Sequence, residues 1–286
     1  MAISMQQWRD DAQYFEHAGN RIAYWTTGRG RPLLLVHGFP TSSWDWTRLW
    51  NKIDGNKHTL IAADMLGFGM SDKPRQDYSI HGQADLQLAI LNHFGITDYD
   101  ALVHDYGCTV GQELLARNLE GSGAVELHRM VFLNGGIFPA QNRPPLSLRL
   151  ADTPLGPIIN RLLTKERLSR GYSVTFGPHT KPTRADLDNL WQMVCENDGR
   201  LMTHKLAHYQ SDRLRHEERW VTVLKKVQDR IGLINGASDP VSGEHGFNRW
   251  VEYLPEAKIY LMPEIGHYPH VEAPDETARI VLEWLG

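Results

Sequence analysis

Short apolar runs alternate with amphipathic stretches along most of the chain. The runs lie at residues 32–36 (PLLLV), 59–63 (TLIAA), 101–103, 130–133, 231–235 and 259–262. They are typical of parallel strands that are buried on both faces. Helical spacing predicts helices near residues 43–52, 79–94, 107–119 and 244–253, and from residue 274 onwards. With a β-hairpin at residues 14–17 and 21–26, this order predicts an α/β fold with a mostly parallel sheet covered by helices.

The alternation stops between about residues 138 and 226. This stretch has no strand signal, contains many prolines, and shows helical patterns near residues 184–196 and 201–214. We therefore expect a helical cap domain at 138–226, inserted into a core domain made of 1–137 and 227–286. Ligands of open α/β sheets bind outside the carboxyl ends of the strands, so the polar residues that directly follow the strands are the candidates for a site.

Composition narrows the class of protein. The chain has 286 residues and a net charge of −4, and its charges are interspersed, which argues against a nucleic-acid partner. It has no apolar run near the roughly 20 residues that span a bilayer, and its first ten residues lack the apolar core of a signal peptide. Two cysteines imply no disulfide framework. We expect a cytoplasmic monomer or homodimer without metal or cofactor.

His104-Asp105-Tyr106-Gly107 follows the apolar run 101–103 directly. A polar residue at a sharp strand-to-helix turn, flanked by a glycine, is the layout of a nucleophile elbow. A carboxylate attacks carbon directly and needs no base to activate it. The alternative is that Asp105 merely caps the following helix, where a carboxylate is favourable.

His37-Gly38-Phe39-Pro40 follows the run 32–36 in the same way. The backbone N–H groups of Phe39 and of Tyr106 are the expected oxyanion hole. Taken alone, the HGFP motif is equally typical of an ordinary turn.

Two further strand ends complete a catalytic triad. Asp239 follows the run 231–235, and His267 follows the run 259–262. The chain order is nucleophile, acid, histidine, as in hydrolases of this sheet type. His267 is the expected base and Asp239 its orienting acid; His270 is the nearest rival base. Asn134, after the run 130–133, is a candidate supporting residue.

These motifs, in this order and with residues 64–72 (DMLGFGMSD), resemble the epoxide hydrolase and haloalkane dehalogenase branch of the α/β-hydrolases. Residues 134–139 (NGGIFP), 169–171, 176–178 and 219–220 resemble one animal subgroup of that branch. The resemblance covers nearly the whole chain. It implies an α/β-hydrolase fold, an aspartate nucleophile that forms an alkyl ester, and a small apolar substrate with water as co-substrate. Further residues expected at the substrate pocket are His37, Gly38, Pro40, His104 and Asn134.

The group that stabilises the leaving atom separates the reactions of this branch. The resemblance implies tyrosine hydroxyls for an epoxide oxygen, for which Tyr209 and Tyr172 are the candidates. It implies indole N–H donors for a halide, for which Trp191 and Trp220 are the candidates. Tyr106 stands where both families usually have tryptophan.

Phe39 is the choice of epoxide hydrolases in the HGxP motif, so we expect epoxides to be opened to vicinal diols. The alternatives are haloalkane dehalogenation, ester or lactone hydrolysis, a cysteine hydrolase acting through Cys108, and a non-catalytic binding protein with the same fold.

Overall fold

A single eight-stranded sheet forms the centre of the computed structural model, which describes residues 3–122 and 125–286. The strands are β1 (Gln13–His17), β2 (Asn20–Gly28), β3 (Arg31–Val36), β4 (His58–Ala63), β5 (Asp98–His104), β6 (Glu126–Leu133), β7 (Ile231–Gly236) and β8 (Lys258–Met262). Their order is β1-β2-β4-β3-β5-β6-β7-β8, in which β3 to β8 are parallel and β1 and β2 are antiparallel. The predicted α/β-hydrolase sheet is confirmed.

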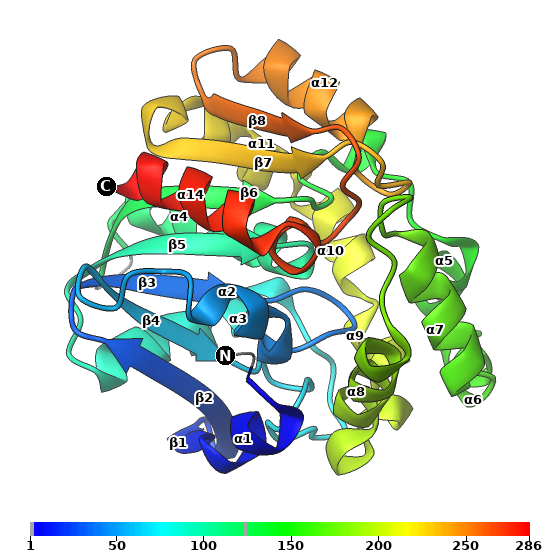
Figure 1. The fold of residues 1–286 in the computed structure, drawn as a ribbon. Coiled ribbons are helices and arrows are strands. Elements are labelled where there is room, and N and C mark those ends of the chain that lie inside the picture. The colour runs from blue at the N-terminus through cyan, green and yellow to red at the C-terminus, as the bar shows by residue number, and fades with distance from the viewer. Residues whose placement is uncertain (1–2, 123–124) are drawn as a thin grey trace.

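Helices cover both faces of this sheet (Figure 1). Those of the sheet region are α1 (Met5–Asp10), η1 (Ser43–Trp46), α2 (Thr47–Trp50), α3 (Ile80–His93), α4 (Tyr106–Glu120), η4 (Gln228–Arg230), α12 (Glu244–Tyr253), α13 (Pro269–Glu272) and α14 (Pro274–Leu285). The helix predicted near residues 43–52 therefore begins as a 3-10 turn, and α1 is a helix that the sequence pattern did not indicate.

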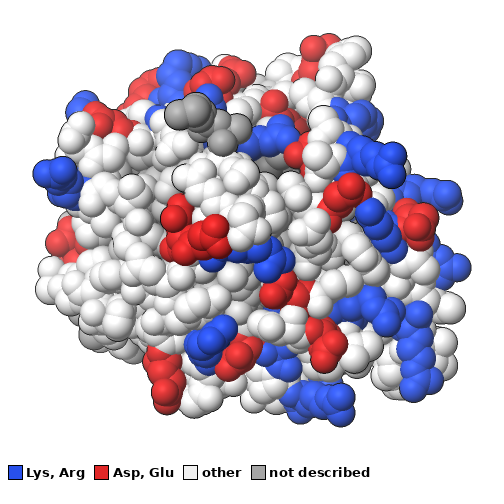
Figure 2. All heavy atoms as spheres, turned by 60° about the horizontal axis from the view of Figure 1, so that its bottom comes forward, with Lys and Arg blue, Asp and Glu red and all other residues white. Residues whose placement is uncertain are grey.

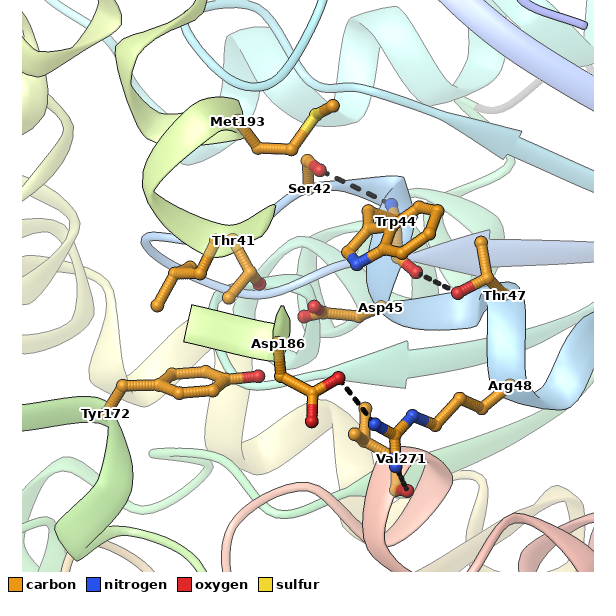
Figure 3. A pocket seen from close by; sticks show the side chains of 11 residues that line it. Thr41, Ser42, Trp44, Asp45, Thr47, Arg48, Tyr172, Asp186, Met193 and Val271 are labelled. Atoms are coloured by element: carbon orange, nitrogen blue, oxygen red, sulfur yellow. Dashed lines mark hydrogen bonds and ion pairs between the residues drawn. The ribbon is translucent and has the colours of Figure 1, made fainter. Parts of the chain in front are cut away.

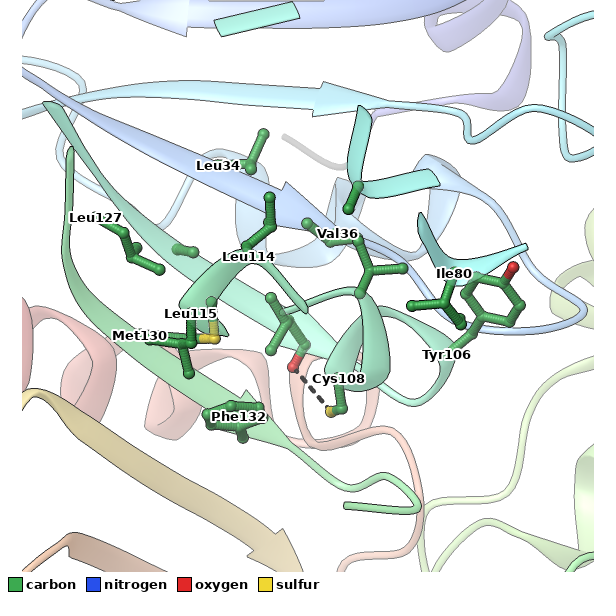
Figure 4. Packing of buried hydrophobic residues seen from close by; sticks show 14 of the residues in the cluster. Leu34, Val36, Ile80, Tyr106, Cys108, Leu114, Leu115, Leu127, Met130 and Phe132 are labelled. Atoms are coloured by element: carbon green, nitrogen blue, oxygen red, sulfur yellow. Dashed lines mark hydrogen bonds between the residues drawn. The ribbon is translucent and has the colours of Figure 1, made fainter. Parts of the chain in front are cut away.

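Alternate side chains of each central strand fill two separate cores. In β3, Leu34 and Val36 pack on one face, against α3 and α4, and Leu33 and Leu35 pack on the other. Figure 4 shows Leu34 and Val36 beside Leu114 of α4. Because both faces are covered, the strand is apolar over residues 32–36, which is why it could be predicted from a continuous apolar run in the sequence.

Between β6 and β7 the chain forms helices only. This helical insert (residues 139–225) lies across the carboxyl ends of the parallel strands (Figure 1). Its helices are η2 (Pro139–Gln141), α5 (Leu146–Ala151), α6 (Gly156–Arg161), α7 (Lys165–Val174), α8 (Arg184–Cys195), η3 (Glu196–Leu201), α9 (Thr203–Leu206), α10 (Tyr209–Arg215) and α11 (Glu217–Lys225).

The single helix predicted over residues 201–214 is divided between α9 and α10. At the junction the N–H groups of His208 and Gln210 bond to carbonyls three residues back, those of Lys205 and Ala207. This tighter 3-10 turn interrupts the α-helical ladder and redirects the chain. The start of α10 lies beside the start of α4, where the ring centroids of Tyr209 and Tyr106 are 4.7 Å apart.

Candidate active site

Asp105 occupies a strained turn between β5 and α4. Its backbone angles are φ 50° and ψ −106°, a conformation that side chains with a Cβ rarely adopt. The neighbouring backbones approach so closely that only glycine fits: a Cβ on Gly107 would lie 2.3 Å from the Val36 carbonyl oxygen, and one on Gly38 would lie 2.8 Å from the Asp105 Cβ. Strain of this kind persists only where the surrounding structure imposes it, and it clusters at functional sites.

The Asp105 carboxylate points away from the helix that it precedes. It makes no hydrogen bond to the first turn of α4. Instead, Oδ1 accepts a 2.9 Å hydrogen bond from the Phe39 backbone N–H, and Oδ2 lies 3.4 Å from His267 Nε2. A helix-capping role therefore does not account for its position.

His267 lies between the two carboxylates. Its Nδ1 is 2.7 Å from Asp239 Oδ2. Asp239 is itself held by Ser242 Oγ at 2.7 Å, by the Val241 N–H at 2.8 Å and by Asn134 Nδ2 at 2.9 Å. These donors fix the carboxylate, which in turn fixes the tautomer and orientation of the imidazole.

The charges of these three side chains depend on one another. Burial favours the neutral form of Asp105, but the hydrogen bond and charge of His267, together with Arg213, hold the pKa of this carboxyl below its usual range. Burial likewise favours a neutral His267, but Asp239 and Asp105 raise the pKa of the imidazole above its ordinary value. Removal of the Asp105 charge therefore lowers the pKa of His267.

A cavity of about 490 Å³ opens onto this group of side chains. Asp105, His267, Phe39 and Pro40 form its floor, and its walls are largely apolar side chains of the helical insert. The apolar wall residues of the insert include Leu146, Leu148, Leu150, Ile159, Leu163 and Leu168. A mostly apolar pocket with a few convergent polar groups suits a small organic ligand.

Tyr209, the first residue of α10, borders the cavity beside Asp105. Its ring lies between those of Tyr106 and Phe39, with centroids 4.7 and 5.9 Å away. The Arg213 guanidinium stands 4.4 Å from the ring centroid. Burial and the Asp105 charge raise the pKa of the phenol, and Arg213 opposes that rise.

Arg213 also ties the helical insert to the elbow. It donates from Nε to Thr109 Oγ1 at 2.7 Å and from Nη2 to the Asp105 backbone carbonyl at 3.1 Å. It is 2% exposed. Sequence reasoning missed this role, because an arginine 108 residues beyond Asp105 gives no local signal.

The second candidate tyrosine, Tyr172, borders the same cavity but points its hydroxyl elsewhere. Figure 3 shows the hydroxyl directed toward Asp45 and Asp186, in a smaller neighbouring cavity of about 40 Å³. The structure therefore places Tyr209 beside the elbow, with its ring against that of Tyr106, whereas the Tyr172 hydroxyl faces the smaller cavity.

The two candidate tryptophans do not line the main cavity. Trp220 is buried against α4, where its indole N–H donates to Glu113 Oε2 at 2.8 Å. That indole is therefore satisfied inside the core and unable to hold a halide beside Asp105. Trp191 lies on α8 and is also absent from the cavity wall.

Several residues expected at the pocket support it from behind. His37 accepts the Met65 N–H at Nε2, and His104 Nε2 lies 2.9 Å from the His267 carbonyl oxygen. Asn134 bridges to Asp239 and to Gly236. All three are fully buried and shape the floor without touching the cavity.

A second buried polar cluster lies behind His267. Asp45, His104 and His270 bring one ligand-type atom each within 4.8 Å of one another. Asp45 Oδ2, His104 Nδ1 and both ring nitrogens of His270 have no hydrogen-bond partner among the described residues. Burial raises the pKa of Asp45 to about 7 and lowers that of His270. His270 is 0% exposed and does not line the main cavity, so it is not placed to act as the base.

The fold and the elbow define an α/β-hydrolase, and residues 31–274 match the family model of the alpha/beta hydrolase fold, so the chain belongs to that family. It is 38% identical to the mesoderm-specific transcript homolog protein of Bos taurus, over 96% of this chain and 85% of that protein. It is 31% identical to a haloalkane dehalogenase of Mycolicibacterium paratuberculosis, over 89% of this chain and 83% of that one. The solved structure of the epoxide hydrolase CorEH superposes with a TM-score of 0.75 at 18% identity, over 96% of this chain and 98% of that one. The predicted family and subgroup are confirmed.

Proposed function

We propose that this hydrolase uses Asp105 as a nucleophile, forms an alkyl-enzyme ester, and opens epoxides to vicinal diols. The observation that carries the proposal is the arrangement around Asp105. Its carboxylate is aimed into an apolar cavity at the elbow apex, with His267 on one side and the Tyr209 phenol bordering the same space. The likeness to an epoxide hydrolase structure and to a haloalkane dehalogenase sequence supports this branch of chemistry.

In the first half-reaction Asp105 attacks an epoxide carbon. The C–O bond breaks as the new ester bond forms, and the Tyr209 hydroxyl gives its proton to the departing oxygen. Protonation matters because an alkoxide is a poor leaving group at neutral pH, and a phenol is a competent general acid. Arg213 favours the phenolate that remains, because its charge lies over the ring.

In the second half-reaction water attacks the carbonyl carbon of the Asp105 ester. Esterification removes the Asp105 charge, so the pKa of His267 falls and the neutral imidazole required of a general base is favoured. The N–H groups of Phe39 and Tyr106 stabilise the oxyanion, since the Phe39 N–H already donates to an Asp105 oxygen. The bond between that carbonyl carbon and the diol oxygen then breaks. The diol oxygen takes the proton that His267 removed from the water, and the second proton of the water restores the Tyr209 phenol.

Replacement of the base tests the covalent intermediate. We expect His267→Gln to accumulate an adduct with 1,2-epoxyhexane, measured by intact mass and located in the peptide of Asp105. The adduct adds the mass of the whole epoxide, because ring opening expels nothing. With 1-bromohexane the gain is that of the hexyl group without bromine, which separates the two reactions. The control is the double variant Asp105→Asn/His267→Gln, which should stay unlabelled.

Failure of both probes to label Asp105 would overturn the covalent mechanism. In that case, loss of p-nitrophenyl ester hydrolysis in Asp105→Asn would favour an ester hydrolase instead. Labelling by bromohexane alone would make the protein a dehalogenase.

The Tyr209→Phe variant tests the acid, because it preserves the ring packing and removes only the hydroxyl. Rapid-quench measurement of ester formation in the His267→Gln background should show epoxide alkylation slowed by roughly 100-fold or more, the usual worth of a general acid. The rate of any alkylation by bromohexane should stay within a few-fold of that in His267→Gln alone, since bromide leaves without a proton. Tyr172→Phe is the matched control, because its hydroxyl is directed toward Asp45 and Asp186 in the smaller cavity. Equal rates of epoxide alkylation in His267→Gln with and without the Tyr209→Phe change would refute the assignment.

A further inference from the structure

Two short helices of the insert, α5 and α6, expose apolar side chains to solvent. Leu155, Ile158 and Leu162 follow one another at the spacing of a single helix face and are 50%, 56% and 50% exposed. Leu146, on α5, is 67% exposed. We name these four residues the apolar ridge. Isolated exposed leucines are ordinary, but four within 17 residues form a patch of the kind that marks an interaction site.

The apolar ridge is continuous with the wall of the catalytic cavity. Leu146 and Leu162 are half or more exposed and also line the cavity. On the other side of α6, Ile159 and Leu163 face into it. The helix is thus apolar on both sides, a pattern that suits an apolar environment rather than water. One layer of helix separates the cavity from whatever covers the ridge.

Positive charge surrounds the apolar ridge. Residues 138–184 carry eight Lys and Arg but only two Asp and Glu, whereas the whole chain has a net charge of −4. Figure 2 shows blue side chains gathered along its right-hand side, where the insert lies. Arg149, Arg161 and Arg170 are exposed, and the described part of the chain offers none of them an ion-pair partner. Arg149 and Arg161 each follow a ridge residue by three positions, so they flank the apolar face.

We propose that α5 and α6 dock onto an anionic lipid bilayer, with the apolar ridge among the acyl chains and the flanking arginines on the lipid headgroups. An amphipathic surface of this composition lies in the interface plane, where apolar burial and attraction to anionic lipids add. The described residues form no helix long and apolar enough to cross a bilayer, so this contact is peripheral. It places the mouth of the cavity against a reservoir of apolar molecules.

Charge favours the bilayer over a second copy of the chain. A symmetric dimer would place this patch against itself and oppose like charges. An anionic bilayer instead pairs every arginine of the patch with a phosphate. The proposal concerns binding alone and stands independently of the reaction at Asp105.

Flotation of the full chain with vesicles tests the docking. We expect binding to phosphatidylcholine vesicles containing about 30% phosphatidylglycerol, and binding at least about ten-fold weaker to pure phosphatidylcholine. Leu155→Ser/Ile158→Ser should lower binding about ten-fold or more. Arg149→Ala/Arg161→Ala should lower it about 25-fold at low salt, because each cationic side chain near an anionic surface is worth about five-fold.

The matched controls are Leu119→Ser, 42% exposed at the end of α4, and Arg29→Ala, exposed in the turn between β2 and β3. Both lie at the end of the sheet opposite to α5 and α6 (Figure 1), so both should bind as wild type does. Circular dichroism and thermal unfolding check that each variant is folded. Three outcomes would overturn the proposal: no flotation of the folded wild type, equal losses in the controls, or a concentration-dependent dimer that Leu155→Ser/Ile158→Ser abolishes while vesicles remain unbound. Vesicle binding that falls with salt but is unchanged in Leu155→Ser/Ile158→Ser would be non-specific adsorption and would also contradict the proposal.

Discussion

The strain at the nucleophile elbow makes an unusual prediction: replacing Asp105 by glycine should give a more stable protein than replacing it by alanine. Both changes remove the carboxylate and its contacts with Phe39 and His267, so those losses cancel in the comparison. What remains is the backbone, at φ 50° and ψ −106°. Such strain costs about 1–3 kcal/mol in a residue with a Cβ. Glycine relieves it but loses about 0.5–1 kcal/mol more conformational freedom on folding.

The balance favours Asp105→Gly by about 1 kcal/mol and by at most about 2.5 kcal/mol. For a chain of this length that is a rise in Tm of about 2 °C, because each kcal/mol shifts Tm by roughly 2–4 °C. Urea unfolding and calorimetry of the two variants measure the difference. Ala116→Gly, inside α4, is the control. There, replacing alanine by glycine should lower the free energy of unfolding by about 1 kcal/mol, the opposite of the effect expected at residue 105. If Asp105→Gly were no more stable than Asp105→Ala, the elbow would not be strained.

Two further expectations concern the groups around His267. Asp239→Asn should lower turnover of 1,2-epoxyhexane by about 10²–10⁴-fold, since the amide holds the imidazole in the wrong tautomer and stabilises its charge poorly; unchanged kinetics would remove Asp239 from the triad. Asp45 has a folded pKa of about 7, above its ordinary value, so the folded protein retains a proton that the unfolded chain releases. Its contribution to stability therefore falls between pH 4 and pH 7 and levels off above, at about 1.4 kcal/mol per pH unit at most. Urea unfolding of Asp45→Asn across that range should show the variant gaining on wild type as pH rises, and a constant difference would refute a neutral Asp45.

The sheet could be predicted from sequence because its central strands are buried on both faces. An apolar run such as residues 32–36 needs no partner to be recognised. The meeting of Asp105, Asp239 and His267 could be predicted for the same reason, since each of them lies within a few residues of the end of such a run. For these residues, the local apolar run alone gives their place in the fold, at the carboxyl end of a strand.

The parts that escaped prediction depend on contacts between distant segments. Trp220 was a reasonable candidate for a halide donor until the structure paired its N–H with Glu113, 107 residues away. The hydrogen bonds from Arg213 to the elbow and the orientation of the Tyr172 hydroxyl likewise depend on how the insert packs. Helix propensity also failed to show the break between α9 and α10, because a 3-10 turn leaves the apolar spacing nearly unchanged.

Asn134 directly follows β6, the last strand before the helical insert, whereas Gly236 ends β7, the first strand after it, and Asp239 lies three residues further on. The Asn134 side chain bonds to both, accepting the Gly236 N–H at 2.7 Å and donating to Asp239 Oδ2 at 2.9 Å. The two strands on either side of the insertion are thus held together by Asn134, the residue that also supports Asp239. Lengthening a loop whose ends are already closed is inexpensive, at roughly 0.6 kcal/mol for each doubling. The helical insert, which lines the cavity, can therefore change in length and sequence during evolution. Such changes alter the cavity wall but leave Asp239 in place beside His267.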